Sequence, residues 1–143
     1  MTVAAAVAIW LRKEPEPCAR VFSRYKGQGF GFGEPVGYQR CYAVLQCGPS
    51  ISNSGFAECF YYPDRDQFIA PCIGFFEKLG RKELVRIFEK AEASVNQYRV
   101  EFSEENDISQ LDSRYYKAIE EQSISELVDE YWRRFPEDFR ETD

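Results

Sequence analysis

The stretch Phe68–Tyr98 reads FIAPCIGFFEKLGRKELVRIFEKAEASVNQY and contains two helical patterns that meet at Gly80. Apolar residues recur at spacings of three and four on both sides of this glycine, which predicts one apolar stripe on each of two helices. Gly80 suits a helix C-cap because glycine tolerates positive φ. The very short connection predicts that helices over 68–79 and 82–98 pack as antiparallel neighbours. The stripes are Phe68, Ile69, Cys72, Ile73, Phe76 and Leu79, then Leu84, Ile87, Phe88, Ala91, Val95 and Tyr98.

Similar spacings predict shorter helices around this pair, and no convincing strand pattern appears outside a glycine-rich region. We therefore expect a compact all-α domain with the antiparallel pair at its centre. Gly48-Pro49 is a stop signal for the first of these helices, and Asp112 or Ser109 is the expected N-cap of a later one. Ser123 and Glu126 have the spacing of a capping box. The expected ranges are 38–45, 51–62, 111–119 and 124–135, the last ended by Pro136.

The first 37 residues differ in character from the remaining 38–143, which are expected to form the helical domain. Val3–Leu11 is an apolar run that predicts a short helix; it is too short to span a bilayer, and no basic residue precedes it as in a signal peptide. Residues 14–37 are expected to be irregular and the most mobile part of the chain, because they hold five glycines and three prolines. Gly27–Gly33 lacks the lysine of a phosphate loop, which favours a connector over a phosphate site.

The histidine and cysteine content of the chain argues against catalysis. The chain has no histidine, the commonest general base and metal ligand. Its five cysteines form no CxxC pair and have no metal spacing, which suits buried, reduced thiols in a cytosolic protein. We accordingly expect no cofactor, no metal and no catalytic residue.

Negative charge is concentrated at the end of the chain. Residues 1–50 carry a net charge of +3 and residues 51–100 a net charge of zero, whereas residues 101–143 hold fourteen acidic and five basic side chains, a net charge of −9. This imbalance is opposite to that of a nucleic-acid binder. The acids either are solvated helix faces and loops or form a surface for a basic partner. The candidate partner-binding residues are Glu101, Glu104, Glu105, Asp107, Glu120, Glu121, Glu126, Asp129, Glu130, Glu137, Asp138 and Glu141.

Several short motifs occur in a particular order between residues 38 and 140. They are Asn53-Ser-Gly-Phe56 followed by Cys59-Phe-Tyr61, the helix end Lys78-Leu-Gly80, Leu111-Asp-Ser-Arg-Tyr115, and the segment from Tyr131 to Phe139. Together they resemble the DNA-mimic-protein family, an all-helical bacterial family. One departure is Ser54, which stands where the family motif usually has the first of two consecutive glycines. Purely structural roles also explain Asn53 and Gly55, because an asparagine can cap a helix and a glycine allows close packing. The motif residues taken forward are Asn53, Gly55, Phe56, Leu111, Asp112 and Tyr115.

The resemblance implies a protein whose carboxylates imitate the phosphates of duplex DNA and occupy the DNA-binding surface of another protein. The expected partner is then a basic, DNA-binding protein such as a transcription regulator, with no direct binding to nucleic acid or membrane. A toxin-neutralising or other acidic binding protein without DNA mimicry is the alternative, and a homodimer is left open.

Overall fold

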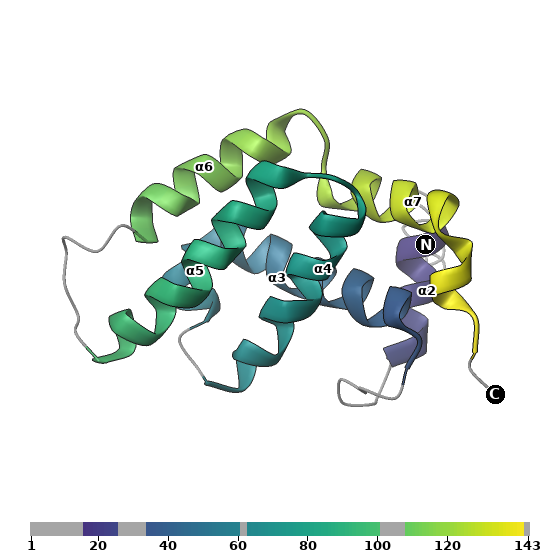
Figure 1. Cartoon of the computed structure of the whole chain (residues 1–143), viewed down its shortest axis with the longest axis horizontal. Coiled ribbons are helices and arrows are strands. Elements are labelled where there is room, and N and C mark those ends of the chain that lie inside the picture. Colours follow the sequence, from purple (N-terminus) through teal and green to yellow (C-terminus); the bar gives the residue numbers. More distant parts are fainter. Residues whose placement is uncertain (1–15, 26–33, 61–62, 101–107, 142–143) are drawn as a thin grey trace, which may run out of the picture.

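The computed structural model describes residues 16–25, 34–60, 63–100 and 108–141, and within them it contains helices and no strand (Figure 1). This confirms the all-α prediction. The elements are α2 (Glu16–Tyr25), α3 (Val36–Cys59), the 3₁₀ helix η1 (Pro63–Phe68), α4 (Ile69–Lys78), α5 (Lys82–Val100), α6 (Ile108–Glu120), α7 (Ile124–Arg134) and the 3₁₀ helix η2 (Pro136–Phe139).

The antiparallel pair α4–α5 forms as the periodicity predicts. Gly80 has φ +73°, the left-handed conformation expected of a C-cap glycine, and nothing would contact a Cβ added there. The pair joins through the buried rings of Phe76 and Phe88, whose centroids lie 5.2 Å apart. Both rings are at most 2% exposed.

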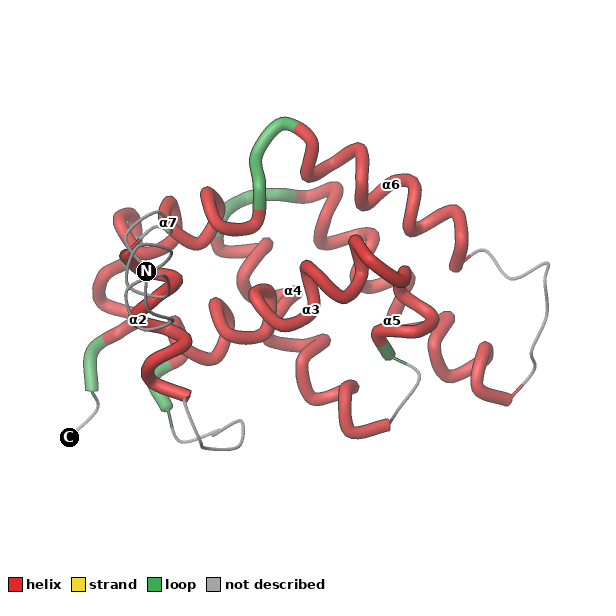
Figure 2. The backbone as a smooth tube through the Cα atoms, turned by 180° about the vertical axis from the view of Figure 1, so that it is seen from behind, coloured by secondary structure: helices red, strands yellow, loops and turns green. Residues whose placement is uncertain are grey.

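Helix α3 lies behind this pair and contacts all the other described helices, from α2 to η2. Seen from behind, it runs through the middle of the molecule, with α2 and α7 at one end and α5 and α6 toward the other (Figure 2). Cys41, Val44, Cys47, Ile51 and Phe56 are buried along it. Burial of so many side chains explains why α3, together with the α4–α5 pair, organises the core.

The helix boundary expected at Gly48-Pro49 is wrong, and the break in α3 lies further along the chain. The helix does not stop at Gly48-Pro49; instead it continues, and Pro49 lies exposed inside it. The break falls at Gly55, whose φ of +86° is non-helical. The helix α6 contacts α3 on both sides of Pro49: the hydroxyls of Tyr115 and Tyr116 donate hydrogen bonds to the carbonyls of Gly48 at 3.5 Å and Ile51 at 3.1 Å.

The expected irregularity of residues 14–37 is wrong for α2. Pro17 lies in its first turn, where proline is tolerated. Cys18 and Val21, one helical turn apart, are at most 1% exposed and pack against α3 and α7. A single turn of apolar spacing is too short a signal to recognise between prolines. The expected helix at Val3–Leu11 and the glycine loop Gly27–Gly33 lie outside the described residues.

The helix-cap predictions for the last two helices have different outcomes. Ser123 caps α7 as the capping-box spacing predicts, with its Oγ accepting the Glu126 backbone N–H at 3.2 Å, and Pro136 follows the helix end. Asp112, however, does not cap α6. That helix begins at Ile108, so Asp112 lies in its second turn and its carboxylate is used elsewhere.

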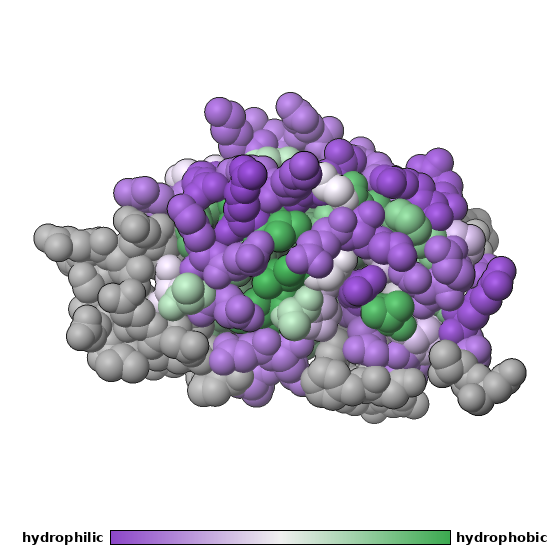
Figure 3. All heavy atoms as spheres, in the orientation of Figure 1, coloured by the Kyte–Doolittle hydropathy of each residue, from purple (hydrophilic) through white to green (hydrophobic). Residues whose placement is uncertain are grey.

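Charged and polar side chains cover most of the face viewed in Figure 3, and hydrophobic side chains reach the surface in its middle, around α4 and α5, and in smaller spots elsewhere. None of the buried described residues carries a charge. The core is therefore apolar and aromatic, and charge interactions belong to its boundary.

Replacing Phe88 with Ala should destabilise the fold by about 3–5 kcal/mol, because a buried ring and its contacts are lost. Phe88 packs edge-on against Phe56 and Tyr115, with centroids at 5.3 and 6.2 Å. Urea unfolding followed by circular dichroism measures the change. Glu89→Ala, at the adjacent exposed position, is the control and should stay within about 0.5 kcal/mol of the parent. A loss below about 1 kcal/mol for Phe88→Ala would contradict the packing described.

Candidate interaction surface

The acidic residues expected to bind a partner differ in their surroundings, and eight of the twelve lie in the part of the chain that the structure describes. Glu101, Glu104, Glu105 and Asp107 lie outside the described residues. The other eight lie at the end of α6, on α7 and in or after η2. Of these, four pair with cations of the same chain and four are exposed without a described partner. The paired acids are Asp129, Glu130, Asp138 and Glu141, and the free acids are Glu120, Glu121, Glu126 and Glu137.

Glu130 is the most extensively paired acid of α7. Its Oε1 accepts from Arg81 Nη2 at 3.1 Å and from Gln122 Nε2 at 3.3 Å, and its Oε2 accepts from Arg134 at 2.9 Å. Partial burial would raise its pKa, but the hydrogen bonds from Gln122 and Arg134 and the charge of Arg81 outweigh that effect and lower the pKa. Glu130 therefore fastens α7 to the α4–α5 turn.

Asp138 is still less available to a partner, since its side chain is only 12% exposed. The Tyr131 hydroxyl donates to it, and the cations of Arg40 and Lys78 lie 3.8 Å away. Arg40 Nη1 also donates to the Tyr131 oxygen at 3.0 Å. Burial, with the carboxylate of Asp138 beside it, raises the pKa of Tyr131. This network holds η2 against α3 and α4.

Two more of the expected binding residues form ion pairs inside the chain. Glu141 pairs with Arg24 of α2, which also contacts Glu34 at 2.6 Å. Asp129 pairs with Arg133, one turn along α7, at 2.6 Å. The charges of both acids are thus largely compensated within the protein. Sequence reasoning missed these pairs because their partners, except Arg133, are distant in the chain.

The free acids gather mainly at the α6–α7 corner, defined here as Glu120, Glu121 and Glu126. Glu120 is the last residue of α6, Glu121 follows it, and Glu126 lies in the first turn of α7. All three are exposed. Glu137 is exposed in η2, apart from this corner in the chain.

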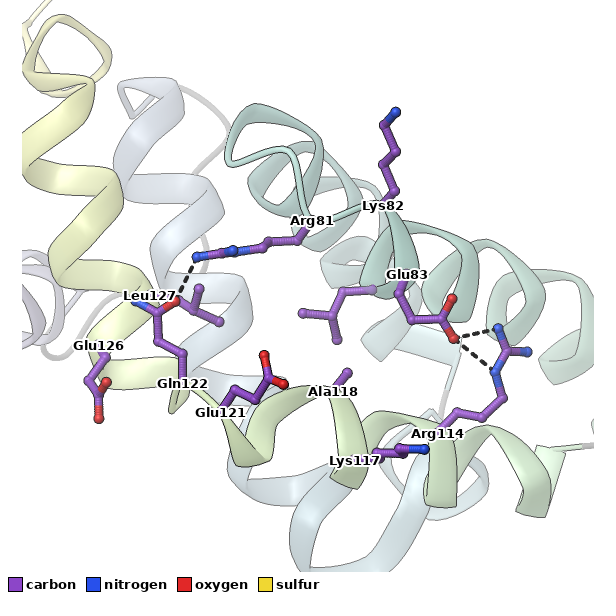
Figure 4. Close-up of a pocket in the computed structure, with 11 residues that line it drawn as sticks. Arg81, Lys82, Glu83, Arg114, Lys117, Ala118, Glu121, Gln122, Glu126 and Leu127 are labelled. Atoms are coloured by element: carbon purple, nitrogen blue, oxygen red, sulfur yellow. Dashed lines mark hydrogen bonds and ion pairs between the residues drawn. The ribbon is translucent and has the colours of Figure 1, made fainter.

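A cavity of about 800 Å³ opens beside this corner, between the start of α5 and the α6–α7 junction (Figure 4). Leu84, Ala118 and Leu127 provide apolar lining. At one side Arg81 donates to Gln122 at 2.6 Å, and at the other Arg114 donates to Glu83 at 2.8 and 3.1 Å. The hydrogen bonds of Arg114 lower the pKa of Glu83. Only Glu121 and Glu126 of the cavity lining were expected from the sequence to take part in binding.

The motif residues form a structural junction between α3 and α6. The Phe56 backbone N–H, directly after the break at Gly55, donates to Asp112 Oδ1 at 2.9 Å. A Cβ on Gly55 would lie 2.6 Å from Asp112 Oδ2, so this approach requires glycine. Among the described residues Asn53 accepts no capping hydrogen bond, and its amide donates to Ser54 Oγ at 3.4 Å. Leu111, Tyr115 and Phe56 are buried, which gives the motif a role in packing.

The sequence profile of a family described as DMP19-like protein matches residues 34–141. This match covers most of the chain. The chain belongs to the DMP19-like family. No curated protein and no solved structure matches the chain.

The DMP19-like region begins just before α3 and ends after η2, so it contains the α6–α7 corner, the cavity and the Asp112 junction. It is the DNA-mimic family that the motifs resemble. Helix α2 lies before the matched region, although it packs on α3 and α7.

The five thiols of this DMP19-like chain are free and buried, in agreement with the expected small hydrophobic role. Burial raises the pKa of Cys41, which disfavours its thiolate. In the part of the chain that the structure describes, no group of three or more cysteine or acidic side chains is placed to hold a metal ion. Among the same residues, no helix has the length and apolar character needed to cross a membrane.

Asp112→Ala should destabilise the fold by about 1–3 kcal/mol, because it leaves the Phe56 N–H without its acceptor. Asp112→Asn keeps an acceptor oxygen and is the matched control. Burial raises the pKa of Asp112, so the folded state holds this proton at pH values where the unfolded state has lost it. The free energy of unfolding of the parent should therefore fall relative to Asp112→Asn as pH rises from about 4 through the raised pKa.

Urea unfolding of both variants across this pH range measures the effects. Equal stability of Asp112→Ala and the parent would show that the hydrogen bond does not hold the junction. A parent that gains stability over Asp112→Asn with rising pH would contradict the direction of the shift.

Proposed function

We propose that this DMP19-like chain is a DNA mimic that occupies the DNA-binding surface of a basic protein, and that it does so through the α6–α7 corner. Family membership supports the class of function. The proposed position of the binding surface rests on one observation: Glu120, Glu121 and Glu126 are exposed and have no cationic partner among the described residues.

Neutralised acids are poor imitations of phosphate. A carboxylate already paired with arginine offers a reduced field to a partner and must break its pair to form a new one. Asp129, Glu130, Asp138 and Glu141 are therefore assigned to holding the fold. The three free carboxylates come from two helices that meet, and this helps because acids along one helix are separated by roughly 4.5–6 Å per turn, whereas duplex DNA carries a charge about every 1.7 Å.

The partner follows from the same chemistry. DNA-binding proteins hold phosphates with arginine and lysine, so a surface shaped to grip DNA also attracts exposed carboxylates. Long-range attraction would speed association at low salt and weaken as salt screens it. The proposed activity is occupation of that surface rather than catalysis, in a cytosolic setting that suits the five free thiols.

Neutralising the corner with Glu120→Gln, Glu121→Gln and Glu126→Gln together should weaken partner binding by about tenfold or more at low salt, since each lost carboxylate removes part of the attraction. The control carries Glu58→Gln, Glu89→Gln and Glu92→Gln, which neutralise three exposed acids elsewhere, and should change affinity less than threefold by the same measure. The partner is captured on the immobilised chain from a heparin-retained fraction of DNA-binding proteins, purified, and measured by biolayer interferometry at stepped salt concentrations.

Duplex DNA added in excess should displace the partner. If DNA leaves the complex intact, the chain is an acidic binding protein without mimicry, as a toxin-neutralising protein would be. Equal losses in the two triple variants would remove the special role of the corner, and direct binding of the free chain to DNA would overturn the whole assignment.

A further inference from the structure

The cavity beside the α6–α7 corner contains a carboxylate whose charge no described residue compensates. Three charged side chains of the cavity lining form ion pairs: Arg81 contacts Glu130, which lies outside the lining, at 3.1 Å, and Arg114 contacts Glu83 at 2.8 Å. Glu121 also lines it, and it makes no described hydrogen bond or ion pair. The charge that a ligand would have to balance therefore depends on the charged lining residues that form no ion pair among the described residues: Lys82, Lys117, Glu121 and Glu126.

The directions in which these unpaired side chains point decide which charge faces the cavity. Figure 4 shows the Glu121 carboxylate turned into the space between Arg81 and Ala118. In the same view the ammonium group of Lys82 extends outward, that of Lys117 lies along α6 toward Arg114, and Glu126 points away. The side of the cavity between Arg81 and Ala118 thus presents the unpaired carboxylate of Glu121, and Leu84, Ala118 and Leu127 supply apolar lining.

We propose that this cavity receives an arginine side chain of the basic partner, with Glu121 accepting hydrogen bonds from its guanidinium group. The inference rests on the proposed function and adds the residue that the partner contributes. The methylene stem of arginine would lie against Leu84, Ala118 and Leu127, while its planar head meets the carboxylate in a paired, two-point contact. Arginine suits such a half-enclosed site better than lysine, because guanidinium is less strongly hydrated than ammonium.

The size of the cavity supports a protein segment as the source of this side chain. About 800 Å³ lies well above the volume of one side chain and within the range of sites that enclose drug-sized ligands. An arginine carried by a turn of a partner would fill more of it than the free amino acid. In a DNA-binding protein, such an arginine is free to contact phosphate when the mimic is absent, so seating it in the cavity would block DNA directly.

The site can be tested without the partner by NMR titration with N-acetyl-arginine methylamide. The methyl signals of Leu84, Ala118 and Leu127 should shift with this probe. The citrulline analogue, a neutral molecule of nearly the same shape, should shift them little. Glu121→Gln should weaken binding by about tenfold, because it removes the charged acceptor. Glu89→Gln, at an exposed acid of α5 outside the cavity lining, is the matched control and should leave affinity within about twofold of the parent. N-acetyl-lysine methylamide should bind more weakly than the arginine probe.

Ala118→Leu provides a second variant that fills the cavity without changing charge and should also weaken binding of the probe. Thermal unfolding of each variant confirms that the fold is kept. Equal shifts with the arginine and citrulline probes, shifts confined to other surfaces, or unchanged affinity of Glu121→Gln would overturn the assignment.

The two proposals fail separately. If the arginine probe binds as described but DNA does not displace the captured partner, the pocket stands and DNA mimicry fails. If DNA displaces the partner while Glu121→Gln and Glu120→Gln weaken the complex equally, mimicry stands and the arginine pocket fails.

Discussion

The hydrogen bond between the Phe56 backbone N–H and the Asp112 carboxylate, made across the break at Gly55, is the constraint on which the rest of the structure depends. It directs the chain after Gly55 so that the ring of Phe56 enters the core, edge-on to Phe88 and Tyr115. It also fixes where α6 lies on α3. Because Glu120 ends α6 and Glu121 follows it directly, the position of these two carboxylates depends on this junction.

A second consequence concerns how the acidic charge is used. The net charge of −9 in residues 101–143 suggests a broad negative surface, yet the structure uses several of these acids to attach the end of the chain to earlier helices. Glu130 joins α7 to Arg81, Asp138 joins η2 to Arg40 and Lys78, and Glu141 joins the following segment to Arg24. Of the expected binding acids that the structure describes, those without a cationic partner are thus found mainly at the α6–α7 corner. A chain with a large negative net charge can therefore have unpaired, exposed carboxylates on only part of its described surface.

Periodicity and cap signals were sufficient for the elements whose determinants are local. The α4–α5 hairpin, its Gly80 cap and the Ser123 cap of α7 depend on residues within one or two turns, and all were predicted. The failures arise where distant residues decide. Pro49 lies inside α3, which packs against α6, and Asp112 lies in the second turn of α6, where its carboxylate accepts from the backbone N–H of Phe56, 56 positions earlier. The cavity was missed for the same reason, since its lining comes from three helices. Individual acids could be found from the sequence, but whether each is paired depends on contacts that only the fold creates.

The most direct test of the central claim, that the partner contacts the α6–α7 corner, is hydrogen–deuterium exchange of the chain alone and saturated with its purified partner. The account predicts slower exchange over residues 118–127 and the first turn of α5, with little change in η1 and η2. Protection centred on α2 or η2, with unchanged exchange at the corner, would contradict it.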